Sequence, residues 1–239
     1  MTNQRNLIPC LLLAAGRGER MRPLTDELPK PLLTIKNKSL LAWHLEALSA
    51  AGIQKVVINH AWLGEKIEDA LGNGSQFGLK ITYSPEANAL ETAGGIRKAL
   101  PLLDPNDYFL VINGDVFCPN FPTELLITQL DKLRKEPNPP LAHLVMVPNP
   151  VQHPNGDFYL KASQVFDDPR DGAEKLTFSG IGLYHRDLFK DLVIGAPAQL
   201  APLLREVILE NRVSGEKYTG PWHDVGTPQR LQELNAANE

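Results

Sequence analysis

Apolar runs alternate with helix-like segments over the first half of the chain, and this alternation constrains the fold more than any other feature. Four runs have the length and turn boundaries of buried strands: 8–14, 55–59, 79–83 and 108–112. The segments between them are typical of helices, at 39–51, 64–71 and 92–100, and we expect the last to end before Pro101. This β-α-β-α-β-α-β order predicts a largely parallel sheet with helices on both faces.

The second half is less regular. It predicts a strand at 141–147, a hairpin of 158–160 with 164–166, and a strand at 176–184. A helix at 199–211, an edge strand at 213–219 and a closing helix at 228–238 follow. The chain has 239 residues and contains no repeat or long linker, so we expect one Rossmann-like α/β domain with a mixed, mainly parallel sheet.

The charge balance excludes several classes of partner. The 24 basic and 28 acidic residues give a formal net charge of −4, which would attract neither nucleic acid nor an anionic membrane. No apolar run approaches the length of a membrane span, and Pro9 interrupts the signal-like stretch that follows Arg5. Cys10 and Cys118 lack the spacing of a metal or redox motif, so we expect reduced, buried thiols in a cytoplasmic protein.

The first expected strand ends in a loop rich in glycine and arginine, L-A-A-G-R-G-E-R-M-R. Gly16 and Gly18 let the backbone approach an anion closely, and the N–H groups of such a loop suit a polyphosphate. Met21 stands where the dinucleotide fingerprint requires glycine, and the G-K-[ST] of a P-loop is absent. A third kind of nucleotide-binding loop is therefore indicated, with Lys30 fixed between two prolines as a nearby cation.

Two acidic side chains are candidate metal ligands. Asp115 follows the fourth expected strand, at the sheet edge where ligands bind in open α/β folds. Asp224, in W-H-D-V-G-T, is the candidate for a second oxygen ligand of a hard cation. In the same segment we interpret Thr227 as a helix cap and His223 as structural.

Six segments, taken in order, resemble the sugar-1-phosphate nucleotidyltransferase family. They are L-A-A-G-R-G-E-R-M-R-P-L-T (13–25), P-K-P-L (29–32), L-E-T-A-G-G-I (90–96), N-G-D-V (113–116), F-S-G-I (178–181) and D-V-G-T (224–227). Together they span nearly the whole chain. The resemblance implies the single-domain fold of that family, with a nucleotide-binding half to about residue 120 and a sugar-binding half over about 121–239.

The resemblance implies transfer of a nucleotidyl group from a nucleoside triphosphate to a sugar 1-phosphate, with release of pyrophosphate. In this reaction an oxygen of the sugar phosphate attacks the α-phosphorus in line, a step that depends on positioning and charge neutralisation. Lys30 and Arg20 would be the catalytic cations, and Asp115 and Asp224 would hold Mg²⁺, with Mn²⁺ as the alternative. The residues implied for nucleotide binding are Leu13, Ala14, Ala15, Gly16, Arg17, Gly18, Glu86, Thr92, Gly94 and Asp115.

The family resemblance also implies which residues recognise the base and the sugar. Glu86 lies where the family reads the base, and a carboxylate accepts the ring N–H of uracil, thymine or guanine, so UTP, dTTP and GTP stay open. The family's E-K-P lysine has no counterpart in 165–172, and Arg170 or Lys175 are the candidates to replace it. The residues implied for sugar binding are Asn113, Gly156, Asp157, Ser179 and Gly180.

Three further segments, 58–69, 156–158 and 176–181, resemble the branch of the family that acts on N-acetylmuramate α-1-phosphate in cell-wall recycling. UTP and that sugar phosphate are the expected partners of a monomer or small homo-oligomer. Within the family, a mannose-1-phosphate guanylyltransferase or a glucose-1-phosphate thymidylyl- or uridylyltransferase is the alternative. From other classes, an inactive nucleotide-sugar-binding regulatory protein is disfavoured by the intact reactive residues. An NAD-dependent Rossmann enzyme is disfavoured by the failed fingerprint.

Overall fold

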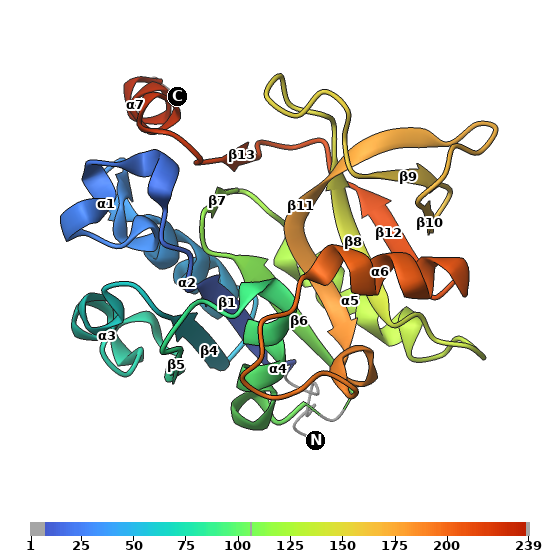
Figure 1. Ribbon diagram of the computed structural model, residues 1–239, viewed down its shortest axis with the longest axis horizontal. Coiled ribbons are helices and arrows are strands. Elements are labelled where there is room, and N and C mark those ends of the chain that lie inside the picture. Colours follow the sequence, from blue (N-terminus) through green and yellow to red (C-terminus); the bar gives the residue numbers. More distant parts are fainter. Residues whose placement is uncertain (1–7, 106, 238–239) are drawn as a thin grey trace.

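One nine-stranded mixed sheet runs through the molecule, and helices cover both of its faces (Figure 1). The computed structural model describes residues 8–105 and 107–237, so Arg5 and the expected helix end at residue 238 lie outside it. The parallel half of the sheet has the spatial order β5 (Lys80–Pro85), β4 (Lys55–His60), β1 (Cys10–Ala14) and β6 (Tyr108–Asn113). It continues through β11 (Glu174–His185), β8 (Ala142–Val147), β12 (Val213–Lys217), β10 (Gln164–Phe166) and β9 (Phe158–Lys161).

Two hydrophobic cores, one on each face of the sheet, explain the layering. Successive side chains of a strand point to opposite faces, so Cys10 and Leu12 of β1 enter one core and Leu11 enters the other. The first core is covered by α2 (Leu40–Ala50), α3 (Gly64–Leu71) and α5 (Thr123–Leu133). The second is covered by α4 (Glu91–Leu103) and α6 (Leu200–Leu209). The predicted single α/β domain with helices on both faces is thereby confirmed.

A third, smaller core packs the segment that follows β1 against the C-terminal helix. Met21 and Val225 are both fully buried in it. The elements around it are short: a 3-10 turn at Glu19–Met21, α1 (Leu24–Glu27), a 3-10 turn at Lys30–Leu32, β2 (Thr34–Ile35), β3 (Lys38–Ser39) and α7 (Pro228–Ala236). Further 3-10 turns lie at Ser75–Phe77 and Arg186–Phe189. Thr227 caps α7, as predicted, by accepting a hydrogen bond from the Arg230 N–H at 3.4 Å.

Two sequence-based expectations are wrong. Helix α4 does not stop before Pro101 but runs through it to Leu103. A proline in the last turn removes a single intrahelical hydrogen bond, while Leu103 is 1% exposed and anchors that turn in the second core. Strand β12 is not an edge strand, because the β9–β10 hairpin adds beyond it and pairs Gln164 with Ser214.

Besides the short elements described above, helix α5 and strands β7 (Val116–Phe117) and β13 (His223–Asp224) have no counterpart in the expected pattern. Helix α5 buries Leu126, Leu130 and Leu133 against the first core. Strands β7 and β13 form a separate two-stranded ribbon. This ribbon joins segments more than a hundred residues apart at the edge where the parallel strands end (Figure 1).

Within the part of the chain that the structure describes, no helix has the length and apolar character needed to cross a bilayer. Cys10 and Cys118 are free and buried, as expected.

Two buried histidines are expected to make the fold sensitive to acid. Burial lowers the pKa of His44 and of His143 from 6.5 to about 4 each. Between pH 6.5 and 4 the unfolded chain therefore binds protons that the folded chain does not, so stability falls as the pH falls. Each histidine contributes on the order of 3 kcal/mol over that range, since one pKa unit corresponds to about 1.4 kcal/mol.

Urea unfolding measured at intervals from pH 7 to 4.5 tests this expectation. The His143→Gln variant keeps an amide for Ser214, which lies 2.8 Å from His143 Nδ1, but cannot titrate. We expect its free energy of unfolding to decline less steeply with falling pH than that of the wild type. An unchanged slope would show that His143 does not supply the acid sensitivity.

Candidate active site

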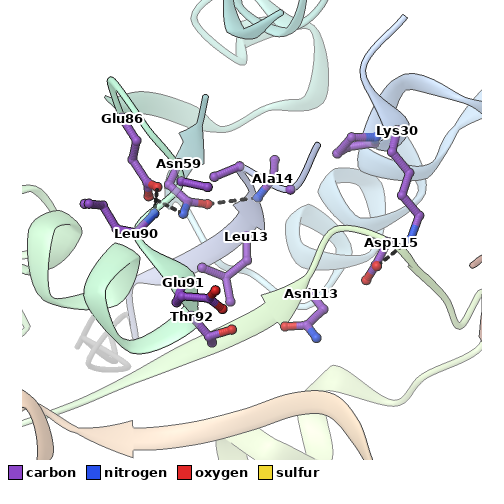
Figure 2. A pocket seen from close by; sticks show the side chains of 14 residues that line it. Leu13, Ala14, Lys30, Asn59, Glu86, Leu90, Glu91, Thr92, Asn113 and Asp115 are labelled. Atoms are coloured by element: carbon purple, nitrogen blue, oxygen red, sulfur yellow. Dashed lines mark hydrogen bonds and ion pairs between the residues drawn. The ribbon is translucent and has the colours of Figure 1, made fainter. Parts of the chain in front are cut away.

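Two cavities open at the carboxyl ends of the parallel strands and meet at Asn113 and Asp115, which line both. The strand register creates this arrangement, because Leu13 at the end of β1 is aligned with Asn59 of β4 and with Asn113 of β6. The first cavity has a volume of about 340 Å³ and is shown in Figure 2. Its lining residues are Leu13, Ala14, Ala15, Gly16, Lys30, Pro31, Asn59, Glu86, Ala89, Leu90, Glu91, Thr92, Asn113 and Asp115.

Glu86 and Asn59 form one end of the first cavity. The Asn59 side chain donates to Glu86 Oε1 at 2.7 Å, and its Oδ1 accepts from the Ala14 N–H at 2.8 Å. Glu86 Oε2 accepts from the Leu90 N–H at 2.9 Å, and Glu86 is 5% exposed. Each carboxylate oxygen has a second lone pair, so this fixed carboxylate can still accept an N–H from a ligand.

Gly95 and Gly94 shape this region in different ways. A Cβ on Gly95 would come within 2.8 Å of both Asn59 Nδ2 and Glu86 Oε1, so only glycine leaves room for their hydrogen bond. A Cβ on Gly94 would approach the Ala196 carbonyl to 2.4 Å. Gly94 thus packs helix α4 against the segment before α6 and does not line the cavity, whereas Thr92 does.

Lys30 and Asp115 lie at the other end of the first cavity, as Figure 2 shows. Lys30 Nζ is 2.6 Å from Asp115 Oδ2, and Lys30 is 8% exposed. The lysine begins a 3-10 turn after Pro29, and a Cβ on Gly18 would lie 3.1 Å from Lys30 Cβ. Gly18 has a φ of +69°, which glycine adopts without strain. The lysine stem therefore packs against Gly18, and the ion pair with Asp115 defines the position of its ammonium group.

The arginines of the glycine-rich loop do not line the cavity. Arg17 donates to the Thr25 carbonyl at 2.8 Å, pairs with Asp26 at 3.1 Å and stacks on Trp62 at 3.8 Å. It therefore braces the loop. Arg20 is exposed and makes no hydrogen bond or ion pair with the described residues.

The two candidate metal ligands come together through the β7–β13 ribbon. Asp224 pairs with Val116 in register, and the Val225 N–H donates to the Asp115 carbonyl at 3.1 Å. Both carboxylates line the second cavity. Arg230 Nη1 lies 2.8 Å from Asp224 Oδ2, so each candidate ligand is ion-paired with a cation in this structure.

The carboxylates of Asp115 and Asp224 suit a hard divalent cation that also binds phosphate oxygens of a ligand. No group of three or more His, Cys, Asp or Glu side chains in residues 8–105 and 107–237 is arranged to hold a metal alone. Two carboxylates are nonetheless what Mg²⁺ commonly takes from a protein when phosphate oxygens and water complete its shell.

The second cavity, of about 230 Å³, lies beside Asp115 on the side of β11. Its remaining lining residues are Asn113, Val116, Pro150, Gln152, His153, Asp157, Thr177, Phe178, Ser179, Gly180, Trp222 and Asp224. Asp157, Ser179 and Gly180 thus lie together, as expected for a common site. Gly156 does not line the cavity, because it packs against the Asn149 side chain, which a Cβ would approach to 2.5 Å.

Neither candidate for the missing lysine reaches the second cavity. Lys175 donates to the Asp157 carbonyl at 3.2 Å and lies over Tyr159, and Arg170 lies over Phe166. Sequence reasoning also missed several residues that line the two cavities, among them Asn59, Trp222 and His153. Trp222 donates to the Ser179 carbonyl at 2.9 Å and so joins the segment before β13 to β11.

The first cavity thus has the Gly16 loop and Lys30 at one end and the Glu86 carboxylate at the other, and the second polar cavity adjoins it. The model of the family described as "Nucleotidyl transferase" matches residues 10–239, and the chain belongs to this family. Members of the family transfer nucleotidyl groups to sugar 1-phosphates, and the chain is an enzyme of this class. The family generally uses divalent metal ions.

Similar proteins cover nearly the full chain. An N-acetylmuramate α-1-phosphate uridylyltransferase of Neisseria meningitidis serogroup B is 51% identical over 95% of this chain and 96% of its own. A protein of the same name from Caulobacter vibrioides is 32% identical over 92% of each chain. A candidate glucose-1-phosphate thymidylyltransferase from Bacillus anthracis, solved with sucrose, has a TM-score of 0.81 at 20% identity, over 96% of this chain and 94% of its own. That structural likeness shows the shared fold.

Proposed function

We propose that the enzyme transfers a uridylyl group from UTP to N-acetylmuramate α-1-phosphate, releasing pyrophosphate and forming the UDP-sugar. The geometry that carries this proposal is the meeting of two cavities at Asn113 and Asp115, with the ammonium group of Lys30 at the junction. The names of the two relatives that match over most of their length support the choice of base and sugar. Residues to about 120 would bind the nucleotide, and about 121–239 the sugar.

The chain's own residues would hold the reactants in line. UTP would occupy the first cavity with its base at Glu86, whose carboxylate accepts the uracil ring N–H. The triphosphate would lie along the Gly16 loop, and Arg20 would reach its terminal phosphates. Lys30 would bridge the attacking sugar phosphate and the α-phosphate, where negative charge increases in the transition state.

Asp115 and Asp224 would hold Mg²⁺, for which Mn²⁺ is the alternative. The bound ion supplies charge neutralisation and orientation of the phosphates. The sugar would lie in the second cavity, among Asp157, Ser179 and Gly180. Because both substrates are cytoplasmic metabolites in this scheme, we expect the enzyme to be in the cytoplasm. We also expect a monomer or small homo-oligomer.

A matrix of substrates tests the proposal. Each of UTP, dTTP, GTP, CTP and ATP is combined with N-acetylmuramate, mannose, glucose and N-acetylglucosamine 1-phosphates, and pyrophosphate release is measured. We expect the highest kcat/KM for UTP with N-acetylmuramate 1-phosphate, and little turnover with ATP or CTP, which lack the ring N–H that Glu86 accepts. A clear preference for GTP with mannose 1-phosphate would contradict the proposal.

A further inference from the structure

A constrained loop, residues 149–157, forms the outer wall of the second cavity. Two tight turns build it: the His153 N–H donates to the Pro150 carbonyl at 2.9 Å, and the Gly156 N–H donates to the His153 carbonyl at 3.2 Å. The Asn149 side chain ties the loop to β11, accepting from Thr177 Oγ1 at 2.9 Å and donating to the Lys175 carbonyl at 3.1 Å. His153 therefore has a fixed origin at the junction of two turns.

Asp157 orients the His153 ring. His153 Nε2 lies 3.0 Å from Asp157 Oδ1, while Asp157 Oδ2 accepts from the Phe178 N–H at 2.8 Å. The carboxylate is thus anchored to β11 and in turn holds one ring nitrogen. His153 Nδ1 makes no hydrogen bond with the described residues, and the side chain is 44% exposed. This ring nitrogen is left available beside the cavity, and it donates a hydrogen bond when both ring nitrogens carry a proton.

The charges around this cavity single out His153. Three carboxylates line it, and two of them are already paired: Asp115 with Lys30 and Asp224 with Arg230. Among the described residues that line the cavity, His153 is the one side chain that can carry a positive charge. An anionic substituent on the sugar would be repelled by the acids, and His153 is the lining side chain that could compensate its charge.

We propose that His153 is the specificity-determining residue that binds the lactyl carboxylate of N-acetylmuramate 1-phosphate, an inference that rests on the proposed function. The His153 ring would bridge two carboxylates, with one ring nitrogen donating to Asp157 Oδ1 and the other to the carboxylate of the substrate. Glucose, mannose and N-acetylglucosamine lack this carboxylate. His153 would thus favour the acidic sugar, while contributing nothing to binding of the shared 1-phosphate.

Steady-state kinetics with a pair of substrates test this role. The pair is N-acetylmuramate 1-phosphate and its lactyl methyl ester, which differ only in the negative charge. We expect His153→Gln to raise KM for the acid about 10-fold or more, as loss of a charge-assisted hydrogen bond would. The KM values for the ester and for UTP should change less than about 2-fold, since neither would contact His153.

His185→Gln is the matched control. His185 also lies beside an aspartate, Asp187 at 3.6 Å, but it pairs with Tyr108 at the amino end of β6, the opposite end of that strand from Asn113 and the cavities. The His185→Gln variant should leave the KM values for the acid, the ester and UTP unchanged. Equal effects of His153→Gln on acid and ester, or no effect on either, would overturn the role of His153 while the proposed function stands. If the wild type used another sugar 1-phosphate but not the muramate, both proposals would fall.

Discussion

Replacing Lys30 with alanine is expected to lower kcat by about 10²-fold or more, with a much smaller change in the KM of either substrate. The ammonium group is fixed at the junction of the two cavities, where its stem packs against Gly18 and its Nζ lies 2.6 Å from Asp115. A cation that is already in place acts most strongly on charge that develops during the reaction. Its removal should therefore affect the transition state more than the bound substrates.

Two matched variants make the Lys30 measurement specific. Lys30→Met keeps most of the buried stem and removes only the charge, so it should lose as much kcat as the alanine variant. Lys55→Ala removes an exposed lysine at the start of β4, at the opposite end of that strand from the cavities, and should be fully active. A loss confined to KM in both Lys30 variants would mean that Lys30 only binds substrate.

The sequence predicts the parts of this site that belong to single strand ends. Asp115 follows a buried strand, and parallel strands place their carboxyl ends at one edge, so its position could be inferred from local pattern alone. His153 and Trp222 could not be found in that way. Their positions depend on the two turns of the 149–157 loop and on the β7–β13 ribbon, which involve contacts between distant segments. Neither carries a local periodic signal.

The errors in the predicted fold have a similar cause. Pro101 is a local stop signal, yet burial of Leu103 in the second core outweighs the single hydrogen bond that the proline removes. The position of β12 in the sheet depends on where the β9–β10 hairpin docks, and strand order is a property of the assembled sheet. A helix start set by a side-chain cap is easier to predict: Thr227 accepts from the Arg230 N–H at the start of α7, as its sequence position indicates.

Asp115→Asn is expected to reduce metal-dependent turnover by at least about 10³-fold while leaving the fold intact. The substitution preserves shape but replaces a charged oxygen ligand by a neutral amide, which holds a hard cation poorly. The Asp115 side chain is 38% exposed. Among the described acids, Asp115 is the one that lines both cavities, so no other carboxylate can take its place at their junction. Thermal unfolding should show little change, because the exposed side of the amide remains hydrated.

Metal binding measured apart from activity decides what the Asp115 variant has lost. Titration of Mn²⁺ in the presence of a non-hydrolysable UTP analogue, followed by electron paramagnetic resonance, should show at least about 10-fold weaker binding in Asp115→Asn than in the wild type. Asp69→Asn removes an exposed carboxylate on α3 and should bind the ion normally. Near-normal activity of Asp115→Asn in Mg²⁺ would remove Asp115 from the metal site. Weak activity with normal Mn²⁺ affinity would instead mean that Asp115 acts by positioning Lys30, whose ammonium group it contacts.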